Sequence, residues 1–224
     1  MANIDDEPIR LSAPGRYRRL RLVTVREIPL PPPSFMQTSF LIALDQRRSA
    51  EEFDPISLEE LSTWLHYTAG IQQVNVQDQN RQRRYVGSFG ALHPAHIVLC
   101  TPNGECFAYI PEKHALGDLA ANKDAALKLR TKAEQYFSSD NAILIVLVSD
   151  GDLVENYYRN VAGLVLRDAG VLFGHAALVA AALGLAFRIL GGTGANLIAH
   201  VLPNLPFKPV ATGIALIGRS NLLR

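Results

Sequence analysis

The sequence predicts an α+β fold, and two observations lead to this prediction. Segments with helical and with strand periodicity are mixed along the 224 residues, without the strict strand–helix alternation of a parallel α/β sheet. With 48% hydrophobic and 19% charged residues, the chain has a globular composition and can bury a sizeable core. The net charge of +1 gives no indication of a nucleic-acid partner.

Residues 1–33 are predicted to form a basic N-terminal arm and a proline-rich connector, ahead of one domain over residues 34–224. Six arginines lie between residues 10 and 26, where they are either a solvated surface or a contact for an anion or leader peptide. Their partial alternation with apolar residues is compatible with a short strand. Pro29 and Pro31 to Pro33 then favour an extended connector.

Two helices are expected next. Ser34 is a suitable N-cap for a helix over residues 35–47. Ser57 and Glu60 have the spacing of a capping box, so a second helix begins at this point and ends at Gly70.

The polar stretch 72–86 is predicted to be a mobile loop, and residues 95–100 and 105–110 a β-hairpin. Cys100 and Cys106 flank the turn of this hairpin. We expect them to be buried free thiols in a cytoplasmic protein, with a disulfide across the hairpin as the alternative.

The C-terminal half alternates helices and strands. Residues 171–190 are apolar enough to span a membrane, but they contain His175 and Arg188 and are predicted to be a buried core helix leading into a strand. We expect helices over 115–137, 154–185 (one or two) and 196–201, and strands over 142–148, 186–190 and 210–217.

Two short motifs carry candidate binding chemistry. Arg47, Arg48 and Ser49 lie at an element boundary, where two guanidinium groups and a hydroxyl can bind phosphate oxygens. A solvated surface is the alternative for this arginine pair. The small residues of the segment 87–94 let a backbone approach a flat ligand closely.

In their order, these landmarks resemble the nitroreductase superfamily of FMN-dependent oxidoreductases. The sequence is most similar to the SagB-type branch, which oxidises azolines to thiazoles and oxazoles in modified peptides. The similarity runs from about residue 28 to residue 219. It rests on Ile28 to Pro33, Arg47 to Phe53, Ser57 to Ser62, Gly87 to Pro94, Arg167 to Gly170, Ala180 to Leu185, Gly191 with Gly192, and Ile214 to Arg219.

This resemblance implies a central mixed or antiparallel sheet flanked by helices, an intertwined homodimer, and FMN at the dimer interface. Independently of the resemblance, no metal-ligand spacing is present in the sequence, and neither a metal nor a membrane is expected. The resemblance places Arg47, Ser49 and Arg219 at the FMN phosphate and Arg48 against the ring or ribityl chain. The remaining assignments are Ser88, Phe89 and Gly90 of the second subunit on one side of the ring, Gly191 and Gly192 at the flavin edge, and Tyr157 as the catalytic acid or base. Without the resemblance, Gly191 and Gly192 form a strand-to-helix turn and Arg219 lies in a solvated tail.

The implied function is an FMN-dependent dehydrogenase that tailors a peptide or another natural product by hydride transfer, with partner biosynthetic proteins as a further expectation. Two positions depart from the family pattern: Glu51 replaces a basic residue, and Asn156 replaces a lysine that works with the tyrosine. These departures motivate an alternative, a nitroreductase-fold binding or assembly partner without flavin chemistry. A further alternative is an NAD(P)H-dependent nitro- or quinone reductase.

Overall fold

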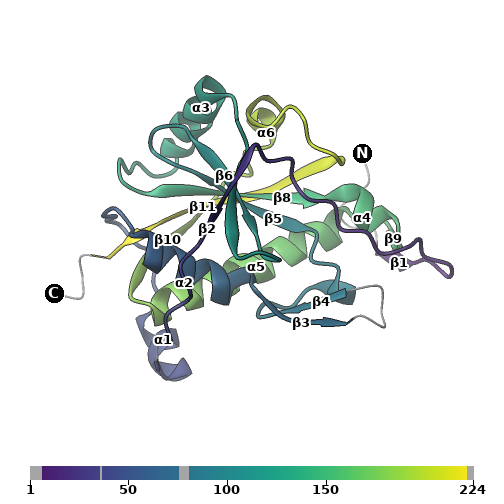
Figure 1. Cartoon of the computed structure of the whole chain (residues 1–224), viewed down its shortest axis with the longest axis horizontal. Helices are drawn as coiled ribbons and strands as arrows, with labels where there is room; N and C mark the ends of the chain where they lie inside the picture. The colour runs from purple at the N-terminus through teal and green to yellow at the C-terminus, as the bar shows by residue number, and fades with distance from the viewer. Residues whose placement is uncertain (1–6, 36, 76–80, 221–224) are drawn as a thin grey trace.

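A seven-stranded sheet forms the centre of the protein in a computed structural model that describes residues 7–35, 37–75 and 81–220 (Figure 1). Every neighbouring pair in this sheet is antiparallel, which confirms the antiparallel form of the expected sheet. The strand order is β10 (Leu185–Leu190), β11 (Pro209–Arg219), β8 (Ile143–Asp150), β5 (Ala95–Cys100), β6 (Cys106–Ile110), β7 (Ala115–Asp118) and β2 (Arg26–Pro29).

Helices cover both faces of the sheet, so the α+β prediction is confirmed (Figure 1). One face carries α3 (Lys123–Glu134) and α6 (Ala195–Val201), and the other carries α2 (Leu58–Ala69) and α5 (Ala162–Ala182). The shorter elements are α1 (Phe40–Gln46), α4 (Gly151–Glu155), the 3-10 turn η1 (Phe89–Ala91), and the two-stranded ladders of β1 (Ile9–Arg10) with β9 (Tyr158–Arg159) and of β3 (Ile71–Asn75) with β4 (Arg81–Arg84).

The apolar run of β8 is continuous because the strand is buried on both faces. Val146 and Val148 belong to the core beneath α3 and α6, whereas Ile145 and Leu147 belong to the core beneath α2 and α5. A strand covered on both sides needs apolar residues at every position. The prediction of a buried central strand is thereby confirmed.

The second predicted helix is confirmed as α2, with its capping box. The Ser57 hydroxyl accepts a hydrogen bond from the Glu60 N–H, and the Glu60 carboxylate accepts one from the Ser57 N–H. This reciprocal pair satisfies two backbone donors that a helix start leaves open. The first predicted helix is shorter than expected, because residues 37–39 precede α1 as coil, and Met36 lies outside the described residues.

Three secondary-structure predictions were wrong, one of them at residues 158–159, which were assigned to a helix and form β9. Residues 115–118, assigned to a long helix, form β7 and pair with β6 and β2 in the sheet. The described parts of the stretch 72–86, assigned to a loop, form the β3–β4 hairpin, and residues 76–80 lie outside the described residues. In the last two cases tertiary pairing outweighed local composition, which for 115–118 favours a helix and for 72–86 favours coil.

Cys100 and Cys106 form a disulfide, so the expectation of free thiols was wrong. The two residues are direct cross-strand partners in the β5–β6 hairpin, with Cα atoms 4.3 Å apart. Such an antiparallel pair brings the side chains close on one face of the sheet.

Helix α5 is the helix expected in the apolar run, but it ends at Ala182, and the run continues as β10. By length and composition alone it could cross a membrane. Its side chains Leu172, Phe173 and Ala176 pack into the core beneath the sheet, as expected of a core helix. Part of the opposite face, including Val171, is exposed.

The N-terminal arm is part of the same structure. Strand β2 forms one edge of the main sheet, and β1 pairs with β9. The Arg19 side chain is 6% exposed and donates to the carbonyls of His93 and Ala95. Arg19 is therefore neither a solvated arginine nor one that is open to a ligand, the two alternatives considered for the arginines of the arm.

Candidate functional site

The first candidate site is a corner where the segment after α1 meets the C-terminal end of β11. The Ala50 N–H donates to the Phe187 carbonyl on the edge strand β10, and the Arg188 guanidinium donates to the Ala50 carbonyl. Asp54 and Arg219 exchange two backbone hydrogen bonds. The structure therefore brings the Arg47–Ser49 segment and Arg219 to the same edge of the sheet.

Arg47, Arg48 and Ser49 are exposed in this corner, and within the described ranges no ion pair involves them. The Arg219 Nε atom lies 3.5 Å from Glu60 Oε1, and the arginine side chain is 60% exposed. The guanidinium groups of Arg47 and Arg48 and the Ser49 hydroxyl are therefore open to solvent, whereas Arg219 would have to give up an exposed ion pair to bind an anion.

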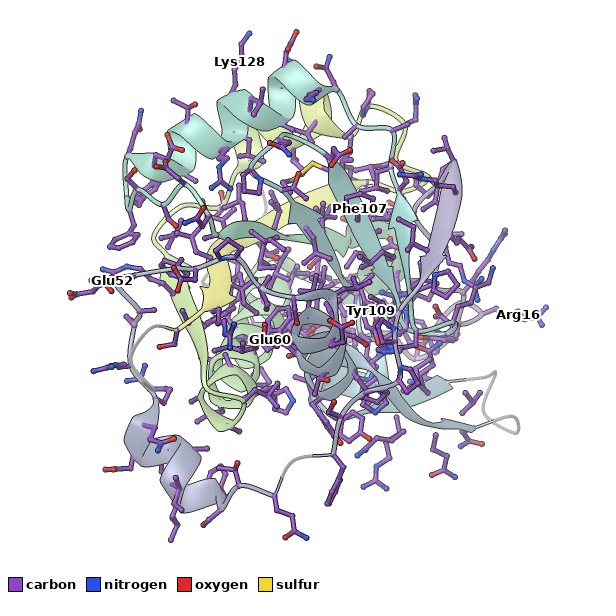
Figure 2. All side chains as sticks on the ribbon, turned by 60° about the vertical axis from the view of Figure 1, so that its left-hand side comes forward. Arg16, Glu52, Glu60, Phe107, Tyr109 and Lys128 are labelled. Carbon is purple, nitrogen blue, oxygen red and sulfur yellow. A yellow bond between two sulfur atoms is a disulfide. The ribbon has the colours of Figure 1, made fainter. Side chains whose placement is uncertain are left out.

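A pocket of ≈360 Å³ lies in the same corner. Arg48 lines it together with α5 and β10, but so do the carboxylates Asp45, Glu51 and Glu52. Glu51 and Glu52 are exposed, and Glu52 lies at the side of the molecule opposite Arg16 (Figure 2). An anion here would meet both signs of charge, so its position depends on which side chains turn toward it.

The second candidate site is the turn around η1. Gly90 has a φ of +55°, and a Cβ at this position would lie 3.1 Å from the Tyr158 hydroxyl. The Ser88 hydroxyl accepts a hydrogen bond from the His93 N–H, which closes the turn. Phe89 packs edge-on against the Tyr158 ring, with centroids 5.8 Å apart.

Asp168 on α5 holds this turn and was not recognised as a site residue from the sequence. Its carboxylate accepts a hydrogen bond from the Phe89 N–H at 3.3 Å and another from Ser88. Burial raises the pKa of Asp168 to about 6, against the opposing effect of these hydrogen bonds and of the Arg84 charge. Only its place in the Arg167–Gly170 motif could have indicated it.

Replacing Asp168 with Asn is therefore expected to stabilise the protein above pH 6. The folded-state pKa lies above the ordinary 3.8, so folding favours the protonated acid, and the wild type loses stability relative to the variant as the pH rises from about 4 to about 6. The difference in unfolding free energy should reach about 2–3 kcal/mol at pH 8 and vanish near pH 3. Urea denaturation of both proteins across this range measures it, and a pH-independent difference would contradict the assignment.

The two candidate sites lie at opposite ends of the sheet in one chain. Strand β8 pairs with Ile217 at its Ile143 end, near Arg219, and with Ala95 at its other end, just after the η1 turn. Its 8 residues span roughly 25 Å. One chain therefore does not bring Ser88, Phe89 and Gly90 to Arg47, Ser49 and Arg219.

Gly191 and Gly192 follow β10, the strand that also lines the first pocket. A Cβ on Gly192 would lie 2.8 Å from the Tyr136 ring, so this glycine permits close packing of an aromatic side chain. The strand-to-helix turn is present, because α6 begins three residues later.

Tyr157 is 3% exposed and packs with Tyr17, Leu92 and Leu153. Its hydroxyl has no hydrogen-bond partner within the described part of the chain. The neighbouring Tyr158 is half-buried and directs its hydroxyl toward Gly90. Both tyrosines lie at the η1 end of the sheet.

Metal ligands were not expected, and the described ranges contain no group of three or more His, Cys, Asp or Glu side chains that could hold a metal ion.

No protein-family model and no curated protein sequence matches this chain. Among solved structures, it is similar to a candidate nitroreductase from Ralstonia eutropha, with a TM-score of 0.71, 21% identity, and coverage of 96% of this chain and 97% of the other. It is also similar to a chain of the E. coli microcin synthetase McbBCD complex with truncated pro-MccB17 bound (TM-score 0.62, 19% identity, 88% and 79% coverage). A nitroreductase with bound FMN from Desulfitobacterium hafniense has a TM-score of 0.51 at 16% identity, with 84% and 93% coverage. The chain therefore has the nitroreductase fold.

Proposed function

We propose that this protein is an FMN-dependent oxidoreductase that acts as a homodimer and dehydrogenates a peptide or another natural product. The observation that carries this proposal is that the segment after α1, which contains Arg47, Arg48 and Ser49, meets the end of β11, which contains Arg219, at one edge of a nitroreductase fold. Similar structures support it, since one contains FMN and another is a microcin synthetase complex with truncated pro-MccB17 bound.

The side chains of this corner fit the phosphate of FMN. Arginine forks and a short hydroxyl match phosphate oxygens, and Arg47 and Arg48 are exposed. When bound, FMN would supply a ring that accepts a hydride from the substrate. Gly191 and Gly192 would lie along its edge.

A second copy of the chain would supply the other side of the ring, namely Ser88, Phe89 and Gly90. The exposed apolar surface supports such a dimer. In α1 only Ala43 is buried, while Phe40, Leu41, Ile42 and Leu44 are 49–70% exposed. A contiguous apolar surface of this kind indicates a protein partner.

The proton that accompanies substrate oxidation would be taken by a tyrosine at the η1 end. Tyr157 is our sequence-based candidate, but its hydroxyl is buried, whereas the Tyr158 hydroxyl lies beside Gly90. Asn156 is exposed and its amide cannot replace a lysine as a base. Closeness to the azoline-oxidising branch and a requirement for partner biosynthetic proteins are parts of the same proposal.

A second candidate function is that of a binding or assembly partner without flavin chemistry. The specific observation in its favour is that Glu51, Glu52 and Asp45 line the same pocket as Arg48. Carboxylates at this position disfavour a phosphate and the reduced, anionic flavin.

The variant Arg47→Ala is expected to separate these candidates. Loss of one charge-assisted contact should weaken FMN binding about tenfold to a hundredfold, because such hydrogen bonds contribute about 1.5–3 kcal/mol. Flavin fluorescence quenching measures the affinity. Riboflavin, which lacks the phosphate, should bind both proteins equally, and Arg26→Ala on β2 is the matched control. Wild-type protein that does not hold FMN would favour the assembly function.

A further inference from the structure

A hollow of ≈740 Å³ lies between the β3–β4 hairpin and the η1 turn, apart from the phosphate corner. Arg84 of β4 lines this hollow and is only 6% exposed. Arg83, on the same strand, is exposed and also lines the hollow. Ser88 and Gly90 of the candidate ring-binding turn form another part of its wall.

Arg84 has no carboxylate partner within 4.0 Å in the described part of the chain. Its Nε and Nη2 atoms both donate to the amide oxygen of Gln82. The Gln82 amide nitrogen in turn donates to Glu112 at 2.8 Å. The neutral amide of Gln82 therefore lies between the Arg84 guanidinium and the Glu112 carboxylate and forms hydrogen bonds with both.

Glu112 is already shared by two other arginines. Its carboxylate oxygens lie 3.8 Å from Arg19 Nη1 and 3.7 Å from Arg21 Nε. The Arg84 charge lowers the pKa of Asp168, but the Asp168 carboxylate accepts its hydrogen bonds from the Ser88 side chain and the Phe89 N–H. Glu112 and Asp168 therefore interact with the Arg84 charge only at a distance, while their direct contacts go to other groups.

The charge environment of the hollow is positive. Burial lowers the pKa of Arg84 to about 9, which leaves it protonated at neutral pH. Burial, together with the charges of Arg84 and Arg19, lowers the pKa of His93 to about 3, so this imidazole is neutral. A buried cation without a carboxylate in direct contact is unfavourable, and an anion that enters the hollow would stabilise it.

We propose that this hollow binds an oxyanion group of the substrate, a carboxylate or a phosphate, with Arg84 at its floor and Arg83 at its mouth. That the bound anion belongs to a substrate rests on the proposed oxidoreductase function. The binding of the anion itself does not depend on that function. Arginine forks recognise both oxyanions with paired hydrogen bonds. Because Ser88 and Gly90 line the same hollow, the bound group would lie next to the proposed position of the flavin ring.

The test is a binding measurement on the full-length protein without added flavin. Benzoate and phenyl phosphate are the probes, benzamide is the uncharged control, and calorimetry gives the dissociation constants. We expect one or both anions to bind at least tenfold more tightly than benzamide, and which anion binds better identifies the oxyanion. Equal binding of all three compounds would overturn the proposal.

Two variants locate the site. Arg84→Met removes the buried cation while keeping an apolar stem, and Arg83→Gln removes the exposed one without touching the core. Each should weaken anion binding about tenfold to a hundredfold, since one charge-assisted contact is lost, and leave benzamide unaffected. Arg26→Gln, an exposed arginine on β2, should change neither. Unchanged anion affinity in Arg83→Gln and in a folded Arg84→Met would overturn the assignment.

The same variants distinguish substrate from cofactor. If Arg84→Met weakens FMN but not riboflavin, the hollow holds the cofactor phosphate and the substrate assignment is overturned. If the anions bind as expected in a protein that never retains FMN, the anion site stands and the oxidoreductase function fails.

Discussion

Mixing two inactive variants is expected to restore about one quarter of the wild-type activity per chain, if each site is built from two copies. The first variant, Arg47→Ala with Arg219→Ala, lacks the phosphate corner. The second, Gly90→Val, blocks the ring-binding turn, because Gly90 has a φ of +55° and an added Cβ would lie 3.1 Å from the Tyr158 hydroxyl. In a mixed dimer one site combines both intact halves and the other combines both damaged halves.

The fraction follows from random assembly. Half of the dimers are mixed, and each has one intact site of two, so a quarter of all sites are active. The measurement is flavin occupancy and substrate oxidation after the variants are unfolded and refolded together, compared with each variant refolded alone. The two candidate sites lie at opposite ends of β8 in one chain, so a complete site requires the phosphate corner of one chain and the η1 turn of another. Absence of rescue in a preparation with proven mixed dimers would rule out the shared site.

Replacing Trp64 with Ala is expected to lower the free energy of unfolding by about 3–5 kcal/mol, the largest stability change among these predictions. Trp64 is 1% exposed, packs against Phe187 with ring centroids 5.8 Å apart, and donates its indole N–H to the Ala176 carbonyl at 3.1 Å. The substitution leaves a cavity between α2, α5 and β10. Chemical denaturation followed by circular dichroism measures the loss.

Two controls accompany this variant. Phe35→Ala removes an aromatic ring that is 79% exposed and should change the unfolding free energy of the single chain by less than about 0.5 kcal/mol. Trp64→Phe retains much of the packing and should have an intermediate effect. A Trp64→Ala protein as stable as the wild type would show that α2 does not anchor this side of the core.

Features that depend on neighbours in the chain were readable from the sequence. The capping box of Ser57 and Glu60 begins α2 as expected, because its hydrogen bonds join residues three apart. The apolar run around Val146 was readable as a central strand, since burial on both faces excludes polar residues. The turn between Cys100 and Cys106 was also predicted, although their disulfide was given only as the alternative to free thiols.

Features that depend on distant pairing were decided only by the tertiary structure. Ala115–Asp118 became a strand because β6 and β2 offered partners on both sides. The role of Asp168 requires α5 to lie against the η1 turn, 79 residues away along the chain. The buried, carboxylate-free setting of Arg84 likewise depends on Gln82 standing between it and Glu112.

The sequence by itself thus determined the α+β class, the order of most elements and the resemblance that points to Arg47, Ser49 and Arg219. Local periodicity and capping act over a few residues, so composition and spacing carry them. The tertiary structure decided which ends of the sheet the candidate residues occupy, and it separated Ser88 to Gly90 from the phosphate corner by roughly the length of β8. Register and sheet order, which arise from long-range pairing, control that separation, and no local pattern encodes it.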